Sequence, residues 1–100
     1  MDWRDPIHPG EILADELQEI GMKPVELAAR IGVPDNQIYQ ILQGQRSITA
    51  DIALRLGKFF NTGPEFWLNL QSAYELDIAR QQIGDMLDEI VPYQSPIAPM

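Results

Sequence analysis

Side-chain amides are concentrated in the stretch GVPDNQIYQILQGQR, which covers residues 32–46. They include Asn36, Gln37, Gln40 and Gln43. An amide carries both a donor and an acceptor, so Asn or Gln can pair in a bidentate manner with adenine in the major groove of DNA. Gln37 and Gln40 are three residues apart and would share one face of a helix, so we expect them to make the principal base contacts. The alternative is that these amides form only a solvated helix face.

Cations that could neutralise phosphates flank the amide-bearing helix. Candidates for phosphate contacts are Lys23 before the preceding helix, Arg46 in the following loop and the hydroxyl of Tyr39. Backbone N–H groups at the start of a neighbouring helix could add to them. Asp35, by contrast, opens the expected reading helix with a negative charge. Because the cations are few, we expect DNA binding to be weak for a monomer and to depend on dimerisation.

A helix, a tight turn and a second helix are needed to present such a face, and the surrounding sequence has that pattern. We predict helices over residues 24–31 and 35–43. Ala28 is small enough for a close helix crossing, Gly32 supplies a left-handed turn, and Ile38 packs back against the first helix. The pattern therefore indicates a helix-turn-helix, although many helical hairpins share it.

Pro and Gly divide the rest of the chain into helix-sized pieces, and no alternation typical of a strand is evident. One helix should begin at Pro9, bury a stripe formed by Leu13, Leu17 and Ile20, and end at Gly21. His8 is the only histidine, so it is more typical of a cap or a surface residue than of a metal ligand. The fold class that follows is all-α.

Two further helices have clear start signals. One is expected after Thr49, which is a good N-cap, and another after Thr62, whose hydroxyl would form a capping box with Glu65. Apolar residues at helical spacing continue through residues 83–90. The last helix is therefore either long or broken near Gly84.

The length of 100 residues with 45% apolar content indicates a single domain. We expect an N-terminal arm at residues 1–8, a helix-turn-helix domain at 9–91 and a disordered tail at 92–100, where three prolines oppose regular structure. There is no cysteine, and no apolar run approaches the roughly 20 residues of a membrane span. These features favour a cytoplasmic protein that does not enter a membrane.

Enzymatic activity is not expected. The paired acids Asp15/Glu16 and Asp88/Glu89 are adjacent in sequence and would be exposed on helices instead of converging in a pocket. The sequence has no phosphate-binding loop, no metal-ligand cluster and no Ser-His-Asp arrangement, so we predict neither a cofactor nor a metal.

The sequence resembles the Xre/Cro-like helix-turn-helix family and, within it, the HigA/VapI-type antitoxins of plasmid-maintenance and chromosomal modules. The resemblance spans residues 7–77 and is carried by HPGEIL at 8–13, LAARIGV and IYQILQGQRSIT within 27–49, and DIALRLGKFFNTGPEFWLNLQSAYELD at 51–77. It implies a compact five-helix, lambda-repressor-like homodimer. Such a protein represses its own operon by binding the promoter DNA and neutralises a basic, RelE-like ribonuclease toxin.

The reading helix departs from what the resemblance implies. Relatives commonly have Ser or Thr at the position of Pro34 and a basic residue at or near Asp35 and Gln40. Two alternatives therefore stay open: a stand-alone transcriptional regulator without a toxin, and a protein-interaction module that has lost DNA binding. The sequence also leaves open whether the apolar stripe at 83–90 covers the core, pairs with a second subunit or docks a toxin.

The formal charge of −8 is unevenly distributed. Residues 1–21 carry one base and six acids, residues 22–58 carry five bases and three acids, and residues 59–100 carry one base and six acids. The motif therefore lies in a segment of charge +2 between two segments of −5 each. The acidic flanks are either a solvated surface or a surface that steers and binds a basic toxin.

Overall fold

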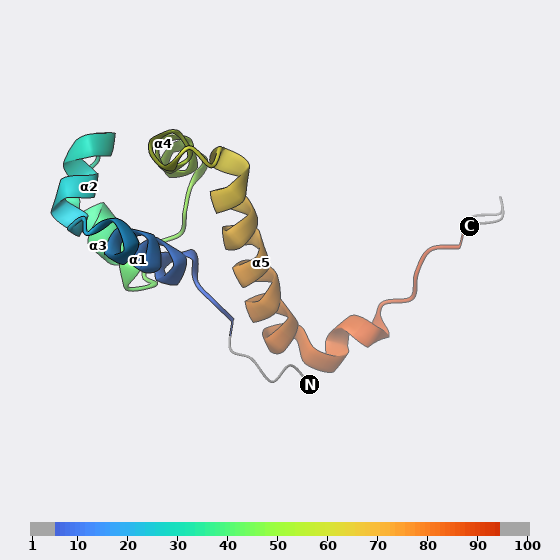
Figure 1. The fold of residues 1–100 in the computed structure, drawn as a ribbon. Helices are drawn as coiled ribbons and strands as arrows, with labels where there is room; N and C mark the ends of the chain where they lie inside the picture. The colour runs from blue at the N-terminus through green and yellow to red at the C-terminus, as the bar shows by residue number, and fades with distance from the viewer. Residues whose placement is uncertain (1–5, 95–100) are drawn as a thin grey trace.

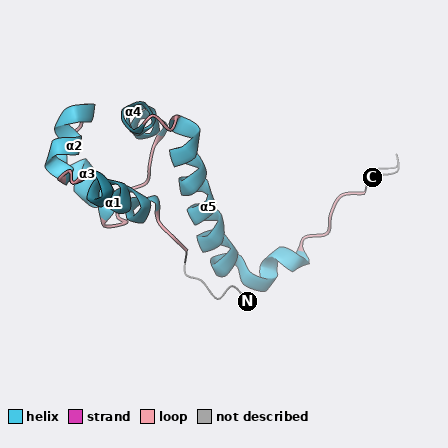
Figure 2. Cartoon of the chain, viewed as in Figure 1, coloured by secondary structure: helices cyan, strands magenta, loops and turns pink. Residues whose placement is uncertain are grey.

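Five α-helices and one short 3₁₀-helix make up the ordered part of residues 6–94, which are the residues that this computed structural model describes. The elements are α1 (Pro9–Ile20), α2 (Pro24–Ile31), α3 (Asp35–Leu42), α4 (Ala50–Phe60), α5 (Pro64–Ile83) and η1 (Gly84–Glu89), as Figure 1 shows. Figure 2 shows helices and loops alone over the described residues. The prediction of an all-α fold with five α-helices is confirmed.

The first four helices enclose the hydrophobic core, and only the first half of α5 joins them. Leu13 of α1, Leu27 of α2, Ile41 of α3 and Leu56 of α4 are all fully buried in one cluster. Trp67 completes this cluster from α5 and is also fully buried. The second half of α5 and η1 extend away from the bundle (Figure 1).

The start of α1 is fixed by His8, which is a buried N-cap. The backbone N–H of Gly10 donates to Nδ1 of His8 at 2.9 Å, and the carboxylate of Glu11 accepts from the backbone N–H of His8 at 3.3 Å. A side chain at Gly10 would overlap the carbonyl group of Ile41, so glycine is required for α1 to pack this closely on α3. The prediction for Ile20 was wrong: its side chain, in the last residue of α1, is 49% exposed, and Leu17 is the last buried residue of the helix.

The predicted capping box of Thr62 and Glu65 is not formed. The N-cap of α5 is Gly63, and α4 ends at Phe60 with Asn61 as its C-cap, in the left-handed region with φ 63°. The Thr62 hydroxyl instead accepts from Nε1 of Trp67 at 3.1 Å and donates to the carbonyl of Gly63 at 3.0 Å. The buried indole in the first turns of α5 has therefore taken the oxygen that a cap would use.

The long helix ends at Ile83 because Gly84 adopts φ 54° and ψ −132°, which no α-helix contains. Of the two possibilities that the sequence left open, a break at Gly84 is the one observed, and η1 follows it. The predicted domain limits stay predictions. Residues 6–8 and 92–94 have no regular secondary structure, and the rest of the predicted arm and tail lies outside the described residues.

Candidate nucleic-acid interface

Helices α2 and α3 form the predicted helix-turn-helix. Gly32 closes α2 with φ 74°, and its N–H and that of Val33 both donate to the carbonyl of Ala28, at 2.9 and 3.0 Å. Ala28 and Ile38 are fully buried where the two helices meet. The turn therefore holds α3 across α2 and leaves its other face open.

The predicted contact residues lie around this open face. Asn36 and Tyr39 are exposed on α3, and Gln37 and Gln40 are half-buried beside them. Gln43 is exposed as the C-cap directly after the helix. Figure 1 shows α3 between α2 and α1, on the side of the molecule away from α5. The structure thus presents a row of amides and one phenol, all uncharged.

The two predicted cations occupy different surroundings. Lys23 is the exposed N-cap residue of α2. Its backbone N–H donates to the carboxylate of Glu26 at 2.8 Å, and its side chain makes no capping hydrogen bond. Arg46 lies in the loop after α3 and contacts Gln40: its Nε donates to Oε1 of Gln40 at 2.8 Å. Within the described part of the chain, this is the one side-chain hydrogen bond that joins two members of the predicted set.

This contact brings a cation to position 40, where the sequence has no basic residue. The residue at that position is uncharged, yet the guanidinium of Arg46 lies directly against it. The loop thus supplies to the exposed face of α3 the positive charge that the helix itself does not contain.

The loop that carries Arg46 is anchored by Gln71, which sequence reasoning missed. Gln71 is only 6% exposed; its Oε1 accepts from the backbone N–H of Ile48 at 2.8 Å, and its Nε2 donates to Glu75 at 2.9 Å. A signal was present, because Gln71 follows Trp67 by four residues and so shares its inward face. A polar residue on a buried face needs a partner, and here that partner is the loop.

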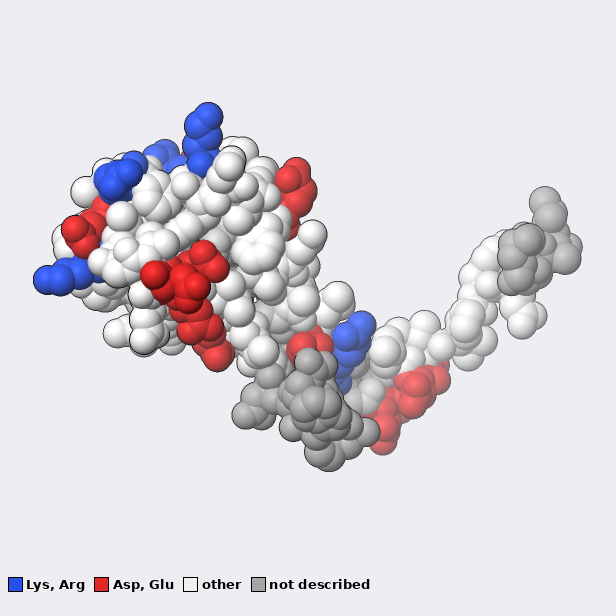
Figure 3. Space-filling view, in the orientation of Figure 1, with Lys and Arg blue, Asp and Glu red and all other residues white. Residues whose placement is uncertain are grey.

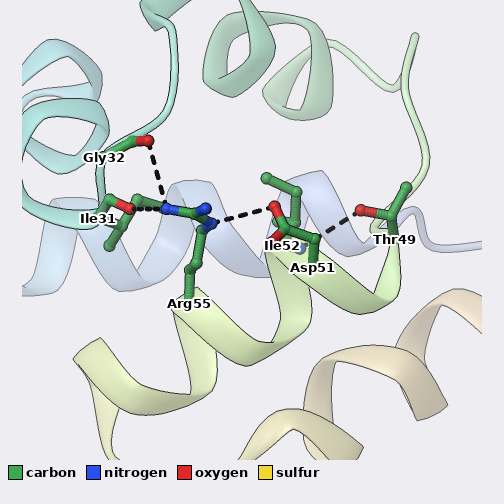
Figure 4. Close-up of polar contacts among 6 residues, drawn as sticks. All are labelled: Ile31, Gly32, Thr49, Asp51, Ile52 and Arg55. Atoms are coloured by element: carbon green, nitrogen blue, oxygen red, sulfur yellow. Dashed lines mark hydrogen bonds and ion pairs between the residues drawn. The ribbon is translucent and has the colours of Figure 1, made fainter.

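Arg55 is a second residue that the sequence did not identify, and Figure 4 shows it extending from α4 to the turn of the motif. Its Nη1 donates to the carbonyls of Ile31 and Gly32 at 2.7 and 3.3 Å, and its Nε donates to Asp51 at 3.0 Å. The carbonyls at the end of a helix lack partners within the helix, and Arg55 satisfies that of Ile31. This arginine is therefore committed to holding α2 against α4.

The negative charge of Asp35 stabilises the start of α3. The N-cap of α3 is Pro34, which forms no side-chain hydrogen bond to the helix. The carboxylate of Asp35 lies in the first turn, where a negative charge stabilises the positive end of the helix dipole. The same charge stands at the edge of the open face and would repel a phosphate.

The charges separate in space as they do in sequence. In Figure 3, Lys and Arg gather mainly over the end of the molecule that contains α2 and α4, whereas Asp and Glu form a patch on α1 and line the segment after α5. Over residues 6–94, no group of three or more His, Cys, Asp or Glu residues is placed to hold a metal ion. None of the helices in the same range is both long and apolar enough to cross a membrane.

Comparison with known proteins places these features in a family. The family described as "Helix-turn-helix" matches residues 13–67. Virulence-associated protein I of Dichelobacter nodosus is 46% identical over 76 residues, which cover 75% of this chain and 70% of that protein. An addiction module antidote protein of a HigA family from Coxiella burnetii has 51% identity and a TM-score of 0.87, with 90% of this chain and 100% of that chain covered.

A further match is the Pseudomonas aeruginosa antitoxin HigA, whose structure was solved with the higBA promoter. It has 42% identity and a TM-score of 0.81, with 92% of this chain and 98% of that chain covered. The fold, the open face and the family match together define a protein of the Xre-type helix-turn-helix class. Within that class, the chain belongs to the HigA/VapI-type antitoxin family.

Proposed function

We propose that this chain is an antitoxin that binds the promoter of its own operon as a homodimer and neutralises a RelE-like ribonuclease toxin. The observation that carries the DNA-binding part is the exposed face of α3, on which the Arg46 guanidinium lies against Gln40. A relative of the same fold, the Pseudomonas aeruginosa antitoxin HigA, was solved with promoter DNA. In this chain the equivalent elements are open and polar.

In the proposed complex, α3 enters the major groove and its amides meet the base edges. Gln37 and Gln40 make the principal base contacts, with Asn36 and Gln43 at either end of the face. Lys23 at the start of α2, the Tyr39 hydroxyl and the free N–H groups of Arg46 are available to phosphates. These residue roles are part of the proposal.

A second copy is proposed because one chain has few cations and leaves apolar surface uncovered. Beyond the core, Leu76 of α5 and the residues Met86, Leu87 and Ile90 are each more than half exposed. Apolar side chains in such a row are typical of a protein interface. A two-fold dimer would also place two α3 helices on half-sites about 34 Å apart, one turn of DNA.

The toxin partner is proposed from the acids of α1. Asp15 and Glu19 are exposed and Glu16 is half-buried, and no positive side chain balances this patch in Figure 3. A negative surface of this kind accelerates association with a basic protein.

Neutralising Asp15, Glu16 and Glu19 together should slow association with the product of the adjacent gene and reduce its salt dependence. The matched variant neutralises Asp85, Asp88 and Glu89; unchanged rates in both triple variants would mean that the acids serve only as a solvated surface.

The DNA-binding proposal is tested by measuring the affinity of the full chain for its own promoter between about 50 and 200 mM salt. We expect sequence-specific binding that weakens with salt, and loss of that binding in Gln37→Ala by a factor of at least about 5 with the thermal stability unchanged. A chain that retains its fold yet binds promoter and unrelated DNA equally poorly would instead be an interaction module. Co-purification with the adjacent gene product separates the antitoxin from a stand-alone regulator.

A further inference from the structure

The only acceptor atom of the Gln40 side chain already takes part in a hydrogen bond within the protein. Its Oε1 receives the hydrogen bond from Nε of Arg46 at 2.8 Å. The nitrogens of an arginine side chain only donate, so the group that faces Nε must be the amide oxygen, and the direction of the amide follows from chemistry. The Gln40 group left over is the NH₂, which also only donates.

Arg46 adds further donors at the same place. With Nε committed to Gln40, the terminal NH₂ groups of the guanidinium remain, and each carries N–H bonds. Both side chains are attached to a held backbone: the N–H of Gln45 donates to the carbonyl of Gln40 at 2.8 Å, and the N–H of Ile48 is bound by Gln71. The two side chains therefore form a unit with several free N–H groups, whose one acceptor atom, the Gln40 oxygen, already has one of its two lone pairs occupied.

Base edges in the major groove differ in whether they match such a unit. Guanine presents two acceptors, N7 and O6, whereas adenine presents an acceptor at N7 and a donor at N6. Cytosine presents a donor, and thymine presents one acceptor beside its methyl group. Bidentate pairing of Gln40 with adenine requires the amide oxygen, one of whose two lone pairs Arg46 occupies, so the hydrogen bond disfavours this pairing while it persists.

We propose that Gln40 and Arg46 act as one donor-rich unit that selects guanine over adenine in the operator, with Arg46 as a positioning residue that sets the direction of the Gln40 amide. The inference rests on the proposed DNA binding and names the nucleobase that Gln40 would contact. Gln37 provides the contrast: among the described residues no hydrogen bond involves its side-chain amide, so both its donor and its acceptor remain available for adenine.

The test is a selection from a randomised double-stranded DNA library with the full-length wild type and the variants Gln40→Ala, Arg46→Ala and Lys23→Ala. The base pair that Gln40 contacts is identified as the position of the selected sequences at which the base preference disappears in Gln40→Ala. At that position we expect the wild type to prefer guanine over adenine by at least about fivefold. In Arg46→Ala the freed amide oxygen can accept from adenine, so the guanine preference should vanish or reverse.

Lys23→Ala is the matched control for loss of a cation. It should weaken binding to all selected sequences alike and leave the base preferences unchanged, as expected for a phosphate contact. The same uniform weakening in Arg46→Ala, with guanine still preferred, would overturn the proposed unit while leaving the DNA-binding proposal intact. A wild type that selects no sequence at all would contradict both, and thermal melting of each variant confirms that it is folded.

Discussion

Gln71 of α5 accepts a hydrogen bond at 2.8 Å from the backbone N–H of Ile48, which lies 23 residues earlier in the chain. Both residues are buried, and the amide of Gln71 is held from its other side by Glu75 at 2.9 Å. One side chain thus joins the helix at the edge of the bundle to the loop that carries Arg46. The geometry of the candidate interface therefore depends on a residue that lies outside it.

Gln71→Leu should lower the free energy of unfolding by about 1–3 kcal/mol, because leucine fills a similar volume and leaves the Ile48 N–H buried without a partner. Denaturant titration measures the change. Gln81→Leu is the control, since Gln81 is exposed on the same helix. Equal stabilities of the two variants would show that Gln71 does not anchor the loop.

Arg55→Met should destabilise the fold by about 1.5 kcal/mol, because it removes the donor that satisfies the carbonyl of Ile31 and the contact between α2 and α4. Arg80→Met removes a guanidinium whose exposed contact with Asp77, at 3.5 Å, lies within one helix, so its effect should stay below about 0.5 kcal/mol. Thermal melting of the two variants under the same conditions measures both losses of stability. A larger loss in Arg80→Met would contradict the role given to Arg55.

The stability of the fold should depend on pH through His8. Burial lowers the pKa of His8 below its usual 6.5, although the nearby Glu11 carboxylate opposes that shift. The unfolded chain therefore binds a proton more readily than the folded chain, so this contribution is complete above pH 6.5 and is lost as the pH falls through the lower, folded-state pKa. Protonation of Nδ1 would also remove the acceptor that caps Gly10.

Unfolding free energies of the wild type and His8→Asn at pH 7.5 and 5.5 test this dependence. Asparagine is a good N-cap that does not titrate, so the difference between the two pH values should be smaller in the variant. An identical pH difference in both proteins would exclude His8 as its source.

Asp35→Arg should raise the general affinity for DNA, because it replaces a repelled carboxylate at the edge of the α3 face by a cation that can release counterions. The salt dependence should steepen by about 0.9 logarithmic units for each phosphate gained. Asp85→Arg makes the same charge change on η1, away from the motif, and should leave the slope unchanged. Equal slopes in the two variants would place Asp35 outside the phosphate contacts.

The elements that the sequence predicted well are those with local signals. Proline at the first position and glycine after the last residue define the limits of α1 and α2, because both act through the backbone dihedrals of a single residue. The amide-bearing face of α3 was also predictable, since Ile38 and Ile41 mark the opposite, buried side. Helical periodicity alone carries this information.

The features that escaped prediction depend on side-chain partners that helical periodicity does not indicate, some near in the chain and some far from it. The Thr62 hydroxyl was expected to cap a helix, but Trp67 takes it, and the carbonyl that Arg55 satisfies lies 24 residues before it. The contact between Arg46 and Gln40 crosses the end of α3 through a left-handed residue, Gly44 with φ 75°. Such pairs become visible only when the helices have been packed against one another.

The separation of charge between the α2/α4 end and the acidic remainder makes the molecule an electric dipole (Figure 3). Close to DNA, within the screening length of about 8 Å at physiological salt, a dipole experiences a torque as well as a force. The torque turns the cationic end toward the phosphates and the acidic end away before any contact forms. Collisions that present the acidic end are thus repelled quickly, and a chain of charge −8 spends little time on DNA in that orientation.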